Sequence, residues 1–131
     1  MKLTIPFYLH KVGAGFPSPA TDYIEDDLDL NTHLISNAPA TFIIRVQGKS
    51  MRDVGIYDGD LLIVDKSISP KSFSTVIANV NEELVVKTFI KEKETSYLTS
   101  GSKSTIDKIN LGENQEVIIW GVVTYVIHKL Q

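Results

Sequence analysis

The sequence contains no cysteine. This excludes a disulfide framework, thiol catalysis and zinc sites built on cysteine, and it fits a reducing compartment such as the cytoplasm. Long apolar runs are also missing, because the longest, residues 117–127, is well short of the ~20 residues that a membrane helix needs. The N-terminal residues are interrupted by Pro6, His10 and Lys11 and make a poor signal peptide. We therefore expect a cytoplasmic protein that is not inserted in a membrane.

The sequence also lacks an excess of basic residues. Its 13 Lys and Arg stand against 16 Asp and Glu, which gives a net charge of −3 at pH 7, and no stretch gathers the cations into a stripe. The bulk electrostatics therefore give no support for direct binding to nucleic acid. A chain of 131 residues with 43% apolar content suits one globular domain with a hydrophobic core.

The N-terminal region differs in composition from the rest. Residues 13–31, "GAGFPSPATDYIEDDLDLN", combine glycine, proline and carboxylates. Proline withholds a backbone donor and glycine favours no single backbone basin, so little regular structure is expected there. We predict an N-terminal arm over residues 1–40 that is extended to about residue 28. Residues 29–36 are a candidate for a short helix capped by Asp29 or Asn31.

From Thr41 onward the pattern indicates β-strands. Runs such as "TFIIRVQG", "DLLIVDKS" and "ELVVKTFI" are rich in β-branched and aromatic residues, and turn sequences such as "YDGD" separate them. Asn81-Glu82 predicts a tight hairpin link, although Asn-Gly would be the stronger signal. Gly121 inside the last run predicts a bend or bulge. The predicted fold class is mainly β: one small domain of mostly antiparallel strands over residues 41–131, with a flexible N-terminal arm.

Lys87 interrupts an apolar run on one predicted strand. Strand alternation puts it on the same face as Val85 and Phe89, while Val86 and Thr88 point the other way. Taken alone, a lysine in this position is more often a gatekeeper on an exposed edge strand than a buried group. If it is buried, the charged form is disfavoured, and the uncharged amine can act as a base.

Ser50 follows a predicted strand in "GKSM", where ordinary turn chemistry is the simplest explanation. A serine becomes a nucleophile only if a neighbouring base takes its proton. The three histidines, His10, His33 and His128, are poor candidates for a triad or a metal site, because they lie in the arm, in the acidic region and near the chain end. A Ser–Lys dyad with Lys87 remains, although the spacing does not show that the two side chains meet.

These motifs together resemble the UmuD family. The resemblance rests on "GKSM", on "GIYDGDLLIVD", on a lysine 87 − 50 = 37 residues after the serine, and on Ala-Gly before "FPSPA". It covers residues 12–130 with gaps. The family comprises self-cleaving serine peptidases related to the C-terminal halves of LexA and lambdoid phage repressors. This chain departs from its relatives at Phe73-Ser74, where they commonly have Gly-Asp, and at "YLTSGSKS", where they tend to have L-x-P/S-x-N.

The resemblance implies a catalytic role for each matching position. Ser50 would be the nucleophile, and Lys87, unprotonated when active, its general base. The backbone N–H groups of Lys49 and Ser50 would form the oxyanion hole. The bond cut would be Ala14–Gly15 in the chain's own arm, and the interpretation of "GAGFPSP" as a flexible linker and nothing more is the less favoured alternative. The resemblance implies neither a cofactor nor a metal.

The resemblance also implies partners. Members of the UmuD family form homodimers and cleave themselves with the assistance of a RecA nucleoprotein filament. The cleaved dimer then serves a Y-family polymerase catalytic subunit of the UmuC type. Together they carry out error-prone translesion synthesis, part of the SOS response to DNA damage. Two alternatives stay open. One is a non-catalytic binding module in which Ser50 and Lys87 are turn and edge residues. The other is a truncated phage-repressor-like peptidase domain, since a repressor needs a helix-turn-helix domain and only fourteen residues precede Gly15.

Overall fold

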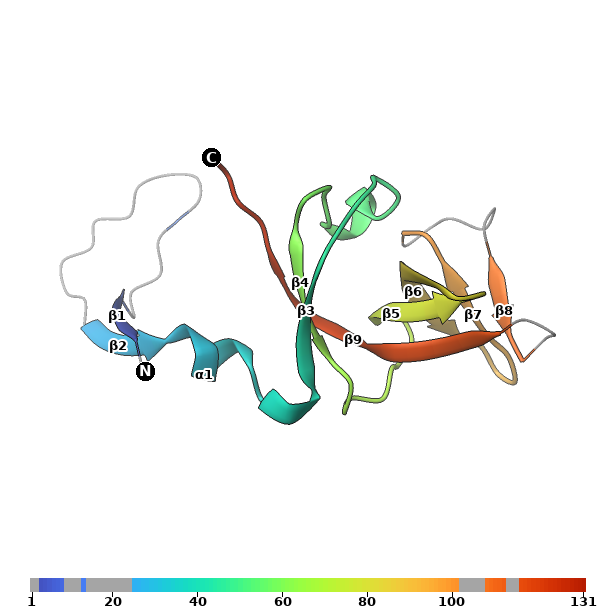
Figure 1. Cartoon of the computed structure of the whole chain (residues 1–131), viewed down its shortest axis with the longest axis horizontal. Helices are drawn as coiled ribbons and strands as arrows, with labels where there is room; N and C mark the ends of the chain where they lie inside the picture. Colours follow the sequence, from blue (N-terminus) through green and yellow to red (C-terminus); the bar gives the residue numbers. More distant parts are fainter. Residues whose placement is uncertain (1–2, 9–12, 14–24, 102–107, 113–115) are drawn as a thin grey trace. The chain divides into compact units, whose positions relative to one another are not determined.

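The computed structural model describes residues 3–8, 13, 25–101, 108–112 and 116–131 (Figure 1). The chain divides into two compact units, Met1–Ser36 and Asn37–Gln131. This boundary lies close to the one expected after residue 40, and the assignment of residues 1–40 as an arm and 41–131 as the peptidase domain stays a prediction. Within the described part of the chain, no helix is both long enough and apolar enough to cross a membrane.

The N-terminal unit contains a strand pair and a short helix. Strand β1 (Thr4–Tyr8) pairs antiparallel with β2 (Glu25–Asp29). The expectation of little regular structure before residue 28 was therefore wrong for these two segments. Pro6 is tolerated because both strands of a two-stranded sheet are edge strands. Helix α1 (Leu30–Leu34) is capped as expected, since the Asp29 carboxylate accepts a hydrogen bond from the backbone N–H of Asn31 at 3.2 Å.

The second unit is built on one seven-stranded sheet in which every pair of neighbouring strands is antiparallel. This confirms the predicted mainly β, antiparallel fold class. Short 3-10 helices lie at η1 (Ala38–Ala40) and η2 (Arg52–Val54). In their order across the sheet, the strands are β3 (Thr41–Arg45), β4 (Leu61–Asp65), β9 (Val117–Ile127), β5 (Thr75–Val80), β6 (Glu83–Lys91), β7 (Ser96–Thr99) and β8 (Ile109–Leu111).

Strand β9 joins the two halves of this sheet. Its first half pairs with β5 and its second half with β4, and both pairings meet at Val122 (Figure 1). The register shifts beside Gly121, as the sequence predicted. A Cβ at Gly121 would lie 2.7 Å from Val64 Cγ1 and 3.0 Å from the carbonyl oxygen of Asp65. Only glycine therefore allows β4 to approach β9 this closely.

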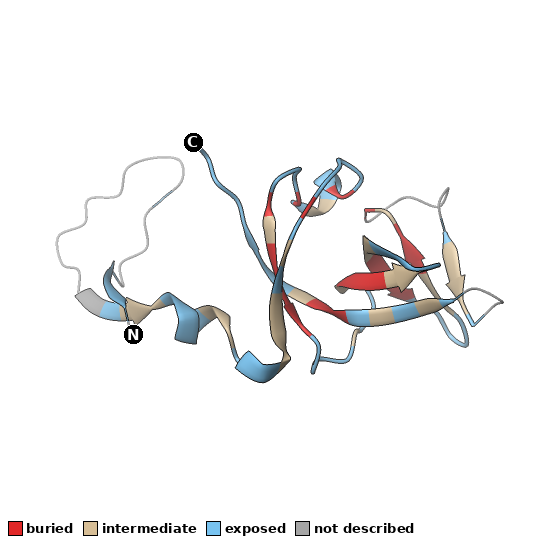
Figure 2. Ribbon diagram, viewed as in Figure 1, coloured by how far each residue is buried: buried red, intermediate tan, exposed pale blue. Residues whose placement is uncertain are grey.

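Two hydrophobic clusters form the core, shown by the buried segments of Figure 2. Ile77 and Val76 are neighbours on β5 but belong to different clusters, because successive side chains of a strand point to opposite faces. The predicted alternation along β6 is confirmed as well, since Val85 and Phe89 pack in one cluster and Val86 against the other. The first cluster contains Val46, Met51, Ile56, Leu62, Val64 and Ile77, and the second contains Val76, Ala78, Phe89, Leu98 and Val122.

The link between β5 and β6 is the tight hairpin predicted from Asn81-Glu82. Val80 pairs with Glu83, and both central residues have positive φ, 51° at Asn81 and 71° at Glu82. Two left-handed residues in a two-residue loop are typical of a type I′ turn, which prefers Asn-Gly because a side chain is strained in that backbone region.

The variant Glu82→Gly should therefore stabilise the protein. We expect the free energy of unfolding to rise by about 0.5–1 kcal/mol, since relief of the left-handed strain exceeds the extra chain entropy that glycine loses on folding. Urea denaturation at neutral pH measures the change. Glu83→Gly is the matched control and should lower stability, because Glu83 begins β6 in extended backbone and pairs with Val80. Equal destabilisation by both variants would contradict the assigned turn.

Candidate active site

Ser50 lies in the loop that connects β3 to β4, and hydrogen bonds close the base of this loop. The N–H of Val46 donates to the carbonyl oxygen of Asp60 at 2.8 Å, and the N–H of Gly59 donates back to the carbonyl oxygen of Val46 at 2.9 Å. Gly48 has a φ of 108°, which favours glycine, and its N–H donates to the Asp58 carboxylate at 2.8 Å. These contacts hold the chain on both sides of the exposed Ser50.

The residue after Ser50 anchors the loop to the core. Met51 is 3% exposed and belongs to the first hydrophobic cluster. Its carbonyl oxygen accepts hydrogen bonds from Val54 and Ile56, both at 3.2 Å, so the turn at η2 winds around a buried side chain. Ser50 is therefore an exposed residue whose position in the chain is next to the buried Met51.

Lys87 lies in the middle of β6 and is half-buried. Strand β6 lies between β5 and β7 in the sheet order, but β7 pairs only with Thr88–Lys91, so Lys87 lies just beyond that pairing. Its partial burial favours the interpretation as a partly buried amine over that of an exposed gatekeeper. On β5, Lys87 faces Val76, which is fully buried. The Lys87 Nζ donates a hydrogen bond to the Ser100 Oγ at 2.7 Å. The amine is therefore held in place rather than free in solvent.

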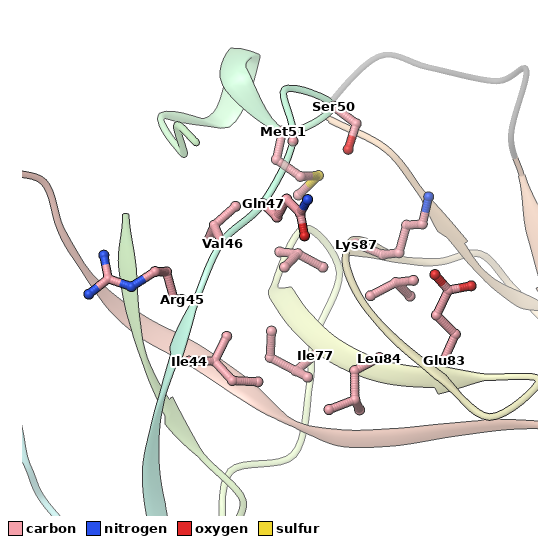
Figure 3. Close-up of a pocket in the computed structure, with 13 residues that line it drawn as sticks. Ile44, Arg45, Val46, Gln47, Ser50, Met51, Ile77, Glu83, Leu84 and Lys87 are labelled. Atoms are coloured by element: carbon pink, nitrogen blue, oxygen red, sulfur yellow. The ribbon is translucent and has the colours of Figure 1, made fainter. Parts of the chain in front are cut away.

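Ser50 and Lys87 line the same groove, which has a volume of about 610 Å³ (Figure 3). Ser50 reaches it from the loop after β3 and Lys87 from β6, and both side chains extend into the same end of the groove. Arg45 and Glu83 add one charge of each sign. The other lining residues are Ile44, Val46, Gln47, Gly48, Met51, Ile77, Leu84, Val85 and Val86.

The remaining sequence candidates lie elsewhere. Lys49 is exposed beside Ser50. Ala14, Gly15 and His10 lie outside the described residues, while His33 lies in α1 of the other unit. Among the described residues, no group of three or more His, Asp or Glu side chains could hold a metal ion. The arrangement thus offers a hydroxyl, an amine and an open groove in one place, which suits proton transfer and nucleophilic attack.

Ser100 was missed by the sequence reasoning. "YLTSGSKS" was noted only as a departure from relatives, and its serines had no assigned role. The hydrogen bond from Lys87 depends on the register between β6 and β7, in which Thr88 faces Thr99. The segment between β6 and β7 contains no hairpin motif, so its length does not reveal the register of the two strands. No local signal in the sequence could therefore have identified Ser100.

His128 has a structural partner outside the groove. Its Nδ1 lies 2.6 Å from Asp60 Oδ1, and the Asp60 Oδ2 accepts the backbone N–H of Tyr57 at 2.8 Å. These hydrogen bonds, from His128 first and Tyr57 second, hold the pKa of the Asp60 carboxyl below its usual value although burial acts to raise it. Because Asp60 also closes the base of the Ser50 loop, the pair ties the chain after β9 to that loop.

Asp60→Asn should make the protein less stable in a pH-dependent way. A carboxyl whose folded-state pKa is depressed contributes stability above its unfolded-state value, near 3.8, and loses it as pH falls through the lower folded-state value. We therefore expect the stability difference between wild type and variant to be full at pH 5 and to shrink as the pH falls below 3.8.

Urea unfolding at a series of pH values measures this difference. Glu94→Gln, which removes an exposed carboxylate from the turn between β6 and β7, controls for the loss of one negative charge. A difference between wild type and Asp60→Asn that stays the same down to pH 2.5 would show that the Asp60 carboxylate is not held as described.

Comparison with known proteins gives extensive matches. A family model described as Peptidase S24-like matches residues 6–124. The chain is 42% identical to Protein ImpA of Salmonella typhimurium over 124 residues, which covers 95% of this chain and 83% of that protein. It is 38% identical to Protein MucA of Escherichia coli over 122 residues, covering 93% and 83% respectively. It is 34% identical to the LexA repressor of Thiobacillus denitrificans over 119 residues, covering 91% of this chain and 59% of the repressor.

Proposed function

The chain belongs to the family of S24-like peptidases, and from this premise we propose that it is a serine endopeptidase of the UmuD type that cuts its own Ala14–Gly15 bond. The resemblance to the UmuD family is confirmed by the matches to Protein ImpA, Protein MucA and the family model. The observation that supports the proposed chemistry is that Ser50 and the half-buried Lys87 line one groove.

The proposed reaction uses these two side chains in sequence. The uncharged Lys87 Nζ accepts the Ser50 hydroxyl proton while the Ser50 Oγ attacks the carbonyl carbon of Ala14. The backbone N–H groups of Lys49 and Ser50 stabilise the resulting oxyanion. The intermediate then expels the amine of Gly15, which takes the proton from the Lys87 ammonium. Water hydrolyses the ester on Ser50, with Lys87 again accepting and returning a proton, and the enzyme is restored.

The residue types at the proposed substrate bond, and its position in the chain, support self-cleavage. Small residues at Ala14–Gly15 let a backbone enter between apolar walls such as Ile44 and Val85. The 50 − 15 = 35 residues between Gly15 and Ser50 would span on the order of 115 Å if fully extended, and α1 and β3 within this segment shorten that reach. This length permits attack on the chain's own arm or on that of a second copy. Tethering raises the local concentration of the bond, so one slow cut per chain is sufficient.

The proposed biological setting follows from family membership. We propose a cytoplasmic homodimer whose self-cleavage is promoted by a RecA nucleoprotein filament and whose residues 15–131 then serve a Y-family polymerase catalytic subunit of the UmuC type. The role would be error-prone translesion synthesis in the SOS response. A net charge of −3 supports contact with DNA through partners rather than directly.

Self-cleavage is tested by following the intact mass of the purified protein at mildly alkaline pH. We expect a fragment that begins at Gly15, because attack by Ser50 on the carbonyl carbon of Ala14 breaks the Ala14–Gly15 bond. A RecA filament on single-stranded DNA should accelerate the cut. Ser50→Ala and Lys87→Ala should each reduce the rate by at least about 100-fold.

The matched control is Lys91→Ala, which removes an exposed lysine from the same strand and should cleave at the wild-type rate. An unchanged mass over several days, with and without the filament, would contradict the proposal and favour a non-catalytic binding module. Cleavage that persists in Ser50→Ala would show that a different nucleophile is responsible.

A further inference from the structure

The strand register places a second serine against the proposed base. In the ladder between β6 and β7, Phe89 faces Leu98 and Thr88 faces Thr99. This pairing ends at Thr88 and Thr99, and Lys87 and Ser100 are the next residues beyond it on the two strands. The hydrogen bond from Lys87 Nζ to Ser100 Oγ, 2.7 Å long, is therefore a cross-strand contact set by the sheet.

The residue after Ser100 contacts the loop that carries Ser50. The N–H of Gly101 lies 3.1 Å from the sulfur of Met51 and donates to it. Gly101 has a φ of 72°, and a Cβ there would clash with the Asp53 carboxylate. Two consecutive residues, Ser100 and Gly101, thus contact the lysine strand on one side and the segment directly after Ser50 on the other.

We propose that Ser100 is a positioning residue for Lys87. An uncharged lysine amine has two N–H donors and one lone pair on a long, rotatable side chain. When one N–H donates to the Ser100 Oγ, the lone pair is restricted to fewer directions. The Ser50 hydroxyl, which the proposed reaction requires the lone pair to reach, lines the same groove. Ser100 does not touch the substrate. It acts through Lys87, and this inference rests on the function proposed above.

The first test is the rate of self-cleavage in the full-length chain. Ser100→Ala should slow cleavage by about 10-fold, the effect of one lost orienting hydrogen bond. Ser100→Thr keeps a hydroxyl on a side chain that suits extended backbone, and should recover most of the wild-type rate. Ser96→Ala is the matched control, because it removes a hydroxyl from the first residue of β7, at the end away from Ser100, and should change nothing. All variants should melt within ~2 °C of the wild type, as expected for small changes at partly exposed positions.

The second test reads the side chain of Lys87 without requiring activity. In protein with isotope-labelled lysine, an amine held in one arrangement gives two different signals for the Hε protons of Lys87. We expect this difference to be lost in Ser100→Ala and retained in Ser100→Thr and Ser96→Ala. Lys87→Ala identifies the signals.

The outcomes separate the two proposals. Slower cleavage and lost Hε inequivalence in Ser100→Ala, with recovery in Ser100→Thr, support the positioning role. A Ser100→Ala protein that cleaves at the wild-type rate, or keeps the Hε inequivalence, overturns that role and leaves self-cleavage intact. If the wild-type protein never cleaves itself, the proposed function is overturned. The role of Ser100 in catalysis is then overturned as well, even if the Hε signals show that Ser100 holds the amine.

Discussion

The approach of β4 to β9 at Gly121 is the constraint on which the rest of the second unit depends. A side chain at Gly121 would clash with Val64 and the backbone of Asp65. The bulge beside Gly121 lets β9 pair with β5 in its first half and with β4 in its second half. The loop that carries Ser50 belongs to the β3–β4 half of the sheet, whereas Lys87 belongs to the β5–β6 half. The shared strand is therefore what brings a hydroxyl and an amine 37 residues apart in sequence, 87 − 50, to one groove.

Each side chain is held by a different kind of contact. The Ser50 loop depends on side chains of its own sequence: Asp58 and Asp60 supply acceptors at its base, and Met51 enters the core. Lys87 depends on its neighbours in the sheet, with a buried valine on one side and the Ser100 hydroxyl on the other. A partly buried amine needs such a polar partner, because an unpaired one would lose its hydration without compensation. These contacts hold the Ser50 loop and the Lys87 side chain where both line the groove.

The sequence predicted the second unit better than the N-terminal one. Alternation along "ELVVKTFI" correctly assigned the faces of Val85, Val86 and Phe89, because a buried strand must place every second side chain in the same cluster. The turn at Asn81-Glu82 and the bulge at Gly121 were found for local backbone reasons. The β1–β2 pair was missed, since its strands are separated by a Gly- and Pro-containing segment and their pairing is a long-range event. The position of β6 between β5 and β7 could not be predicted for the same reason: strand order is not a local property.

By itself, the sequence determined the fold class, the family and the two residues proposed for catalysis, because alternation, turn chemistry and the spaced motifs "GKSM" and "VVKTF" are all short-range features. The tertiary structure alone decided that β6 lies between β5 and β7, that Ser50 and Lys87 share a groove, and that the amine reaches Ser100. The physical reason is register. A shift of one residue between β6 and β7 would turn Ser100 to the opposite face of the sheet, and only the packing of both faces selects the register that is observed.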